Sequence, residues 1–104
     1  MAAKIIEHSK FVEPRGEIYT IYDDRQIDIP FKQDKASISY KGVVRGFHGD
    51  ADTYKLITCL DGVIQLVVHD VDENYTQTFV LNANSDNLRT VLVPPRHLNA
   101  HQCL

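Results

Sequence analysis

Short runs of alternating or β-branched residues recur along the chain. They read GEIYTIYDD, ASISYKGVVRGFH, YKLITCL, GVIQLVVHDV, YTQTFVLN, LRTVLVPP and NAHQCL. Val, Ile, Thr and Tyr dominate these runs, as is typical of strands, and helical periodicity is scarce. EPRG, LDG and NANSDN separate the runs as turns, and DRQIDIPF is the one irregular connection of note. The pattern predicts an all-β fold, an antiparallel sandwich or barrel of jelly-roll type with about seven strands.

The segment LDG, between YKLITC and VIQLVVH, is the sharpest turn signal in the chain. Asp-Gly tolerates the positive φ angles of tight two-residue turns. The sequence therefore predicts a β-hairpin at this point.

Length and composition limit what the chain can be. Its 104 residues predict one domain, 1–104, whose core is small enough that a dimer would help. A formal charge of −3 is too mild to favour nucleic acid or a membrane surface. No apolar run approaches the length of a membrane span, and the start MAAKIIEHSK does not resemble a signal peptide. We expect a cytoplasmic protein without nucleic-acid or membrane partners.

Two cysteines and two histidines have structural interpretations. Without a secretion signal, Cys59 and Cys103 are expected as buried free thiols rather than a disulfide, with Cys59 in the core. His8 is expected at the surface and His69 on a sheet face.

The stretch GVVRGFHGDADTYKLITCLDG resembles the first motif of cupin barrels, G-x5-H-x-H-x3–4-E-x6-G. Gly42, His48 and Gly62 match it, whereas Asp50 and Lys55 stand at two ligand positions. The second cupin motif, P-x-G-x2-H, is represented by Pro94, Arg96 and Asn99. A protonated lysine has no lone pair for a metal and repels one. This pattern favours a pocket without metal or other cofactor. A three-histidine site of His48, His97 and His101 stays open as a lesser alternative.

Four segments of the chain resemble the dTDP-4-dehydrorhamnose 3,5-epimerase family. EPRGEIYTIY is similar to its D-x-RG strand, FKQDKASIS to its F-x-Q-D-N-x-S-x-S segment, GVVRGFHGDADTYKLITC to its G-V-x-RG-x-H…K-L segment, and VLVPPRHLNAH to its I-P-x-G-x-x-H-G-F segment. The resemblance runs from Glu13 to His101. The variant RGxHGD…TYKL…C with a later NAH looks closer to members that act on GDP-linked 4-keto heptoses.

The resemblance implies a cupin barrel that epimerises nucleotide-linked 4-keto-6-deoxy sugars for cell-surface carbohydrate biosynthesis. His48 would be the general base, and Lys55 would stabilise the enolate oxygen. The substrate-binding positions that carry over are Arg15, Gln33, Arg45, Asn99 and His101. The arginines suit a diphosphate, because guanidinium forks match phosphate oxygens. The family also implies a homodimer that exchanges N-terminal strands, for which GEIYTIYDD is suited.

The sequence departs from the family at three places. The family's acid tyrosine and the aspartate that orients the base come beyond the position of Leu104, and Lys35 stands where the family has asparagine. Two further functions therefore stay open: a 3,4-ketoisomerase, which needs only same-face proton transfer, and a non-catalytic protein that binds nucleotide sugars. Structural alternatives also stay open for the site itself. His48 could be a hydrogen-bonded barrel residue, Lys55 a solvated rim residue, and the arginines surface ion-pair partners.

Overall fold

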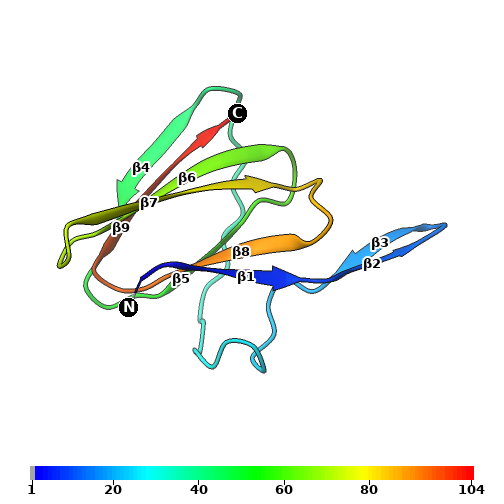
Figure 1. The fold of residues 1–104 in the computed structure, drawn as a ribbon, viewed down its shortest axis with the longest axis horizontal. Helices are drawn as coiled ribbons and strands as arrows, with labels where there is room; N and C mark the ends of the chain where they lie inside the picture. Colours follow the sequence, from blue (N-terminus) through cyan, green and yellow to red (C-terminus); the bar gives the residue numbers. More distant parts are fainter. Residues whose placement is uncertain (1) are drawn as a thin grey trace.

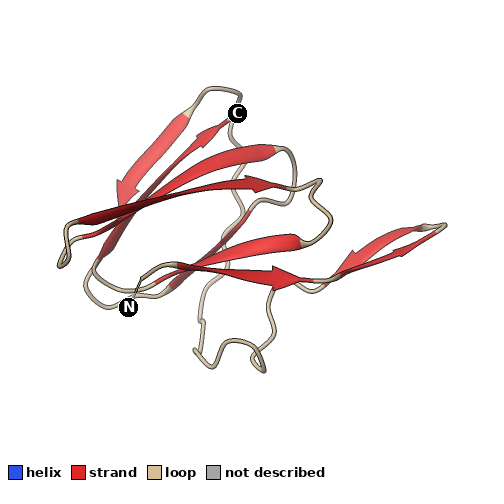
Figure 2. Cartoon of the chain, viewed as in Figure 1, coloured by secondary structure: helices blue, strands red, loops and turns tan. Residues whose placement is uncertain are grey.

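Every regular element within residues 2–104 is a β-strand (Figure 2). The computed structural model describes residues 2–104, so residue 1 of the predicted domain lies outside the described part. The strands are β1 (Lys4–His8), β2 (Lys10–Glu13), β3 (Gly16–Tyr19), β4 (Val44–His48), β5 (Lys55–Thr58), β6 (Val63–Asp70), β7 (Tyr75–Asn82), β8 (Leu88–Val93) and β9 (His97–Cys103). Within residues 2–104, no helix could cross a membrane. The all-β prediction is confirmed.

The strands form two main antiparallel sheets that enclose the core. One has the order β1-β8-β5 and the other β4-β9-β6-β7 (Figure 1). Gln77 of β7 links the two sheets on one side of the sandwich. Its Nε2 donates to the carbonyl of Ala3, just before β1, at 3.2 Å. Both sheets supply the buried cluster, which consists of Ala3, Cys59, Leu66, Val68, Leu81, Val91 and Val93.

The hairpin of β2 and β3 projects from the sandwich as an arm (Figure 1). Its strands pair only with each other in the described chain, and Pro14 and Arg15 form its turn. The radius of gyration is 14.1 Å, against about 13 Å for a compact domain of 100 residues. The arm thus leaves an apolar strand pair outside the core, with Phe11, Val12 and Ile18 exposed.

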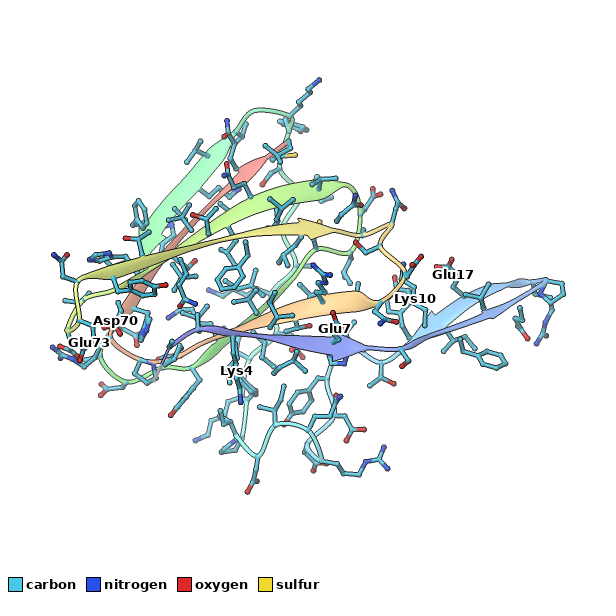
Figure 3. All side chains as sticks on the ribbon, in the orientation of Figure 1. Lys4, Glu7, Lys10, Glu17, Asp70 and Glu73 are labelled. Carbon is cyan, nitrogen blue, oxygen red and sulfur yellow. The ribbon has the colours of Figure 1, made fainter. Side chains whose placement is uncertain are left out.

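A buried lysine, Lys10, attaches the base of this arm to the sandwich. The side chain of Lys10 is only 7% exposed, and its Nζ donates to the carbonyl of Ala83 at 2.9 Å. Glu17, on the neighbouring strand of the arm, lies 3.9 Å from the same nitrogen (Figure 3). Because a buried ammonium needs such partners, these contacts fix where the arm leaves the sandwich.

The predicted hairpin at LDG is wrong, although its turn chemistry is right. Gly62 has a φ of +77°, as expected for this turn. However, β5 pairs with β8, whereas β6 pairs with β7 and β9. The carbonyl of Gly62 accepts from the N–H of Ala83 at 2.9 Å, and that of Val63 accepts from Leu104 at 3.0 Å. The turn therefore carries the chain from one sheet to the other, held by segments distant in sequence.

The N-terminal third also differs from the predicted strands. The strand expected over GEIYTIYDD ends at Tyr19, and that over ASISYKGVVRGFH begins only at Val44. Between them, residues 20–43 form a long connection without regular strands. Alternation alone does not make a strand, because each strand needs a neighbouring edge to pair with. Ile38 and Tyr40, which alternate as a strand would, are exposed.

The histidine and cysteine expectations are confirmed in part. His8 is buried rather than at the surface, because its Nε2 meets Thr90 Oγ1 at 3.1 Å, and that hydroxyl lies 2.7 Å from Thr58 Oγ1. His69 lies on β6, where its Nδ1 meets the Thr76 hydroxyl. Both thiols are free; Cys59 is a core residue as predicted, but Cys103 is only half-buried.

Candidate functional site

The inner face of the four-stranded sheet changes from apolar to polar between β6 and β9. Leu66 and Val68 of β6 belong to the buried cluster. The register places His101 opposite Leu66 and Asn99 opposite Val68. Because directly opposed residues share a face of the sheet, both polar side chains of β9 lie on the inner face.

The polar surface continues onto β4, at the edge of the same sheet. Arg45 lies opposite His101, and His48 lies opposite Asn99. Asn99 Nδ2 donates to the His48 carbonyl at 3.1 Å, which fixes the backbone that carries the imidazole. The four predicted residues of β4 and β9 therefore share one surface: Arg45, His48, Asn99 and His101.

Gly46 allows β4 to approach β9 at this place. Its φ is +135°, and a Cβ there would collide with the side chain of Ala100 and the carbonyl of Asn99. The register of the two strands also shifts between Arg45 and His48. The glycine of the RG-x-H motif thus has a physical role: it lets the strand that carries His48 sit directly against β9.

Lys55 enters from the opposite sheet. It is the first residue of β5 and lies opposite Val93, a member of the buried cluster, so its side chain starts on the inner face of that sheet. The side chain is 28% exposed, and its Nζ is 3.8 Å from Asp50 Oδ2. Lys55 is therefore half-buried at the sheet's end.

Burial and positive charges act on His101. Burial, followed by the nearby charges of Arg45 and His48, lowers the pKa of His101 below its ordinary value. These effects favour the neutral imidazole of His101. The Arg45 guanidinium donates to Ser39 Oγ at 2.9 Å and to the Ile38 carbonyl at 3.3 Å. Arg45 thereby also links β4 to the long connection before it.

The two remaining predicted residues lie elsewhere in the chain. Arg15 occupies the tip of the arm, where its guanidinium pairs with Glu13 at 2.9 Å. Gln33 is exposed in the long connection. Within residues 2–104, neither forms a hydrogen bond or ion pair with His48 or Lys55. One protomer thus brings five of the seven predicted side chains onto the two inner faces.

His97 has partners of its own at the end of the sheet. Its Nδ1 donates to the Pro95 carbonyl at 2.8 Å, and its Nε2 lies 3.5 Å from Asp70 Oδ2. In the described chain, no three His, Cys, Asp or Glu side chains are grouped as a metal site. The geometry therefore gives no support to the three-histidine alternative.

Sequence reasoning missed the partner of Lys55. The cupin motif indicates only that Asp50 stands at a metal-ligand position, whereas in the structure its carboxylate is the ion-pair partner of Lys55. The segment DADT carried a signal for this. An aspartate that accepts from backbone N–H groups two and three residues later forms a tight turn and has a fixed orientation.

Solved structures with the same fold are known from several bacteria. An epimerase of Mycobacterium tuberculosis superposes with a TM-score of 0.87 at 24% identity, over 99% of this chain and 57% of its own. A dTDP-6-deoxy-D-glucose-3,5-epimerase of Legionella pneumophila gives 0.86 at 26%, over 98% and 60%. A 3,4-ketoisomerase of Helicobacter canadensis gives 0.82 at 15%, over 100% and 75%.

The chain spans about three fifths of the length of the two epimerases. The superpositions confirm the predicted cupin-type barrel. No curated protein sequence matches the chain. The family described as dTDP-4-dehydrorhamnose 3,5-epimerase matches residues 2–104, nearly the whole sequence. The chain therefore belongs to the dTDP-4-dehydrorhamnose 3,5-epimerase family.

Proposed function

We propose that the protein is an epimerase of nucleotide-linked 4-keto-6-deoxy sugars that removes and returns a proton at C3, C5 or both. The observation that carries this proposal is the placement of an imidazole, His48, and an ammonium, Lys55, on facing inner surfaces of a barrel of this family. The Legionella neighbour was crystallised with dTDP-4-keto-L-rhamnose, a sugar nucleotide of this class.

The chemistry follows from the acidity of hydrogens beside a ketone. The His48 imidazole accepts the proton, and the electron pair of the broken C–H bond moves into an enolate. The Lys55 ammonium stabilises the negative charge that develops on the enolate oxygen. A general acid on the opposite face of the sugar, which the family resemblance implies to be a tyrosine, returns a proton to the carbon and inverts it as the enolate collapses back to the ketone.

The arginines would hold the nucleotide diphosphate. Arg45 lies on the same inner face as His48 and offers a fork of N–H donors. Arg15 cannot share this role within one protomer as the arm stands, so we assign it to the site of a partner subunit. This assignment requires a homodimer in which the arm of one chain extends to the other, with Arg15 at its tip.

A second candidate is a 3,4-ketoisomerase of the same barrel. This reaction needs proton transfer on one face of the sugar only. The two imidazoles on one surface, His48 and His101, suit such a transfer, because burial and the charges of Arg45 and His48 favour the neutral form of His101. A non-catalytic protein that binds nucleotide sugars is the third candidate.

Further proposals concern the substrate, the role of metal and the cellular location. The sequence RGFHGDADTYKL with the later NAH favours a GDP-linked 4-keto heptose as the substrate. We also propose that the chemistry is independent of metal, because Lys55 and Asn99 stand at ligand positions of the cupin motifs. A cytoplasmic location, where sugar nucleotides are made, completes the proposal.

Solvent deuterium incorporation tests the function. Purified protein is incubated in D₂O with dTDP- and GDP-linked 4-keto sugars, and loss of the C3 and C5 proton signals is followed by NMR. We expect exchange in wild type and a loss of about 10²–10⁴-fold in His48→Asn. His69→Asn, which changes a histidine outside the site, should exchange at the wild-type rate. Absence of exchange with every substrate, together with nucleotide-sugar binding in calorimetry, would favour the non-catalytic protein. Product analysis separates epimers from 3-keto isomers.

A further inference from the structure

The connection between β4 and β5 joins the two candidate catalytic residues and carries Asp50. One carboxylate oxygen of Asp50, Oδ1, accepts from the backbone N–H groups of Asp52 at 3.1 Å and Thr53 at 2.7 Å. These bonds, with that to Thr53 the strongest, and the charge of Lys55 lower the pKa of Asp50. Asp50 is therefore an ionised carboxylate whose orientation is fixed by its own turn.

The same connection is fastened to the turn between β8 and β9. The Asp50 carbonyl accepts from the N–H of Arg96 at 2.9 Å. Gly49 lies so close to the His97 carbonyl that no side chain would fit there. The Arg96 guanidinium in turn binds Asp72 with two bonds of 2.7 Å. Asp50 is thus fixed twice: its carbonyl is bound by the turn between β8 and β9, and its carboxylate is bound by the N–H groups of its own turn.

This arrangement leaves one oxygen, Oδ2, to face the Lys55 ammonium at 3.8 Å. Val93, Arg96 and Asp52 do not compete with this ion pair. Val93, directly opposite Lys55, carries no charge, and the Arg96 guanidinium is already paired with Asp72. Asp52, the other carboxylate of the connection, has no ion-pair partner within residues 2–104.

We infer that Asp50 is a positioning residue that directs the Lys55 ammonium toward the place where the enolate oxygen forms. The role in catalysis rests on the function proposed above, whereas the ion pair itself does not. Lysine has a long, flexible stem, so a fixed carboxylate limits where its nitrogen can go. An ammonium has three N–H donors, so one N–H that points toward Asp50 leaves two for a substrate oxygen.

The role is one of orientation rather than stability. The side chains of the pair are 28% and 52% exposed, and ion pairs at such positions contribute little to folding. Asp50→Asn is a sharp variant, because the amide oxygen can still accept from Asp52 and Thr53 while the charge is lost. Asp52→Asn is its matched control: the same change two residues away, without an ion pair to remove.

Two measurements test the inference. The first is the rate at which an amine-directed acyl ester modifies Lys55, read by peptide mass spectrometry; it needs no enzymatic activity. We expect Asp50→Asn to raise this rate severalfold, since a lysine side chain released from the carboxylate moves more freely and is reached more easily by the ester, and Asp52→Asn to leave it unchanged. The second is deuterium exchange into a 4-keto sugar nucleotide. Asp50→Asn should lower kcat roughly 10- to 100-fold, as is usual for a residue that orients a functional group, with little change in KM.

The outcomes separate this inference from the proposed function. If Lys55 is acylated at the same rate in wild type and Asp50→Asn, the carboxylate does not control the ammonium, and the inference is overturned. If acylation changes but kcat and KM stay at the wild-type values, Asp50 pairs with Lys55 without assisting the chemistry, which also overturns it. A wild-type protein that exchanges no substrate defeats the proposed function and the catalytic part of the inference. The acylation comparison then still decides whether the ion pair holds Lys55.

Discussion

At the scale of single residues, the lowered pKa of His101 makes the stability of the fold depend on pH. The folded protein has a His101 pKa below the ordinary value of 6.5, with burial as the largest cause. The unfolded chain therefore binds the proton more readily. The contribution of His101 to the free energy of unfolding falls as the pH drops through 6.5, and it is fully present above that pH.

Removing one of the causes should move this pKa in a known direction. Arg45→Ala takes away a nearby positive charge, so we expect the His101 pKa to rise toward, but not reach, its ordinary value, because burial remains. An NMR titration of the imidazole C–H signals measures it. Arg89→Ala, which breaks the ion pair with Glu7 on the other sheet, is the control and should leave the titration unchanged. An unaltered pKa in Arg45→Ala would show that the guanidinium does not act on His101.

Residue spacing predicted part of the site for a physical reason. Residues His48 and Lys55 flank one short connection, so the motif spacing alone brings them to the same end of the barrel. Asn99 and His101 alternate on a single strand and therefore share a face. Arg15 could not be placed in this way, because its position depends on the direction of an arm that the local sequence does not specify.

At the scale of elements, the contact of β4 with β9 should be sensitive to one methyl group. Gly46→Ala forces a Cβ against Ala100 and places alanine at a φ of +135°. Gly16→Ala in the arm imposes nearly the same φ, +143°, but meets no atom within 4 Å. We expect Gly46→Ala to destabilise the fold by about 1–3 kcal/mol more than Gly16→Ala, the usual cost of overpacking. Urea unfolding measures both; equal losses would mean that the strands can separate without cost.

The turn into β9 has an arginine where the cupin motif has glycine. Arg96 adopts a φ of +61°, and its guanidinium binds Asp72. Arg96→Gly and Arg96→Ala both remove this exposed ion pair, but only glycine relieves the backbone strain. We expect Arg96→Gly to be about 1 kcal/mol more stable than Arg96→Ala. Thermal unfolding checks the order of the two variants, and the reverse order would contradict the strain.

The strands that the sequence predicted well are those with long alternating or apolar runs. YTQTFVLN coincides with β7, and GVIQLVVHDV and LRTVLVPP contain β6 and β8, although β7 lies at an edge of its sheet. β1 and β2 escaped prediction because their runs are only five and four residues long and only Ser9 separates them, with no glycine or proline to mark a turn. The sheet order could not be predicted either, since Gly62 specifies a turn but not which strands it separates.

At the scale of the whole molecule, the proposed independence of metal can be tested directly. Lys55 and Asn99 lie on the inner faces, at positions where cupin barrels hold metal ligands. We expect purified protein to contain less than stoichiometric transition metal in elemental analysis, and dialysis against a chelator to leave deuterium exchange unchanged. One tightly held metal ion per chain, or exchange lost to the chelator and restored by metal, would contradict the proposal.

The arm allows a test of the proposed dimer that leaves the core intact. Deleting residues 1–22 would remove β1 as well, and β1 pairs with the central strand β8, so that deletion confounds assembly with folding. Phe11 and Ile18 are better targets, because they lie directly opposite each other on the arm and are 63% and 65% exposed. Their apolar surface is what a partner would cover.

The double variant Phe11→Ser with Ile18→Ser should therefore be a folded monomer. Burying such a side chain fully contributes about 1.5–3 kcal/mol, and a two-fold dimer buries each of them twice. Even partial burial makes the dimer at least about 100-fold weaker without them. Light scattering measures the mass, and circular dichroism checks the fold; Val80→Ser, at an exposed position on β7, should remain a dimer. A wild-type monomer, or a double variant as dimeric as wild type, would remove the arm from the interface and Arg15 from the partner's site.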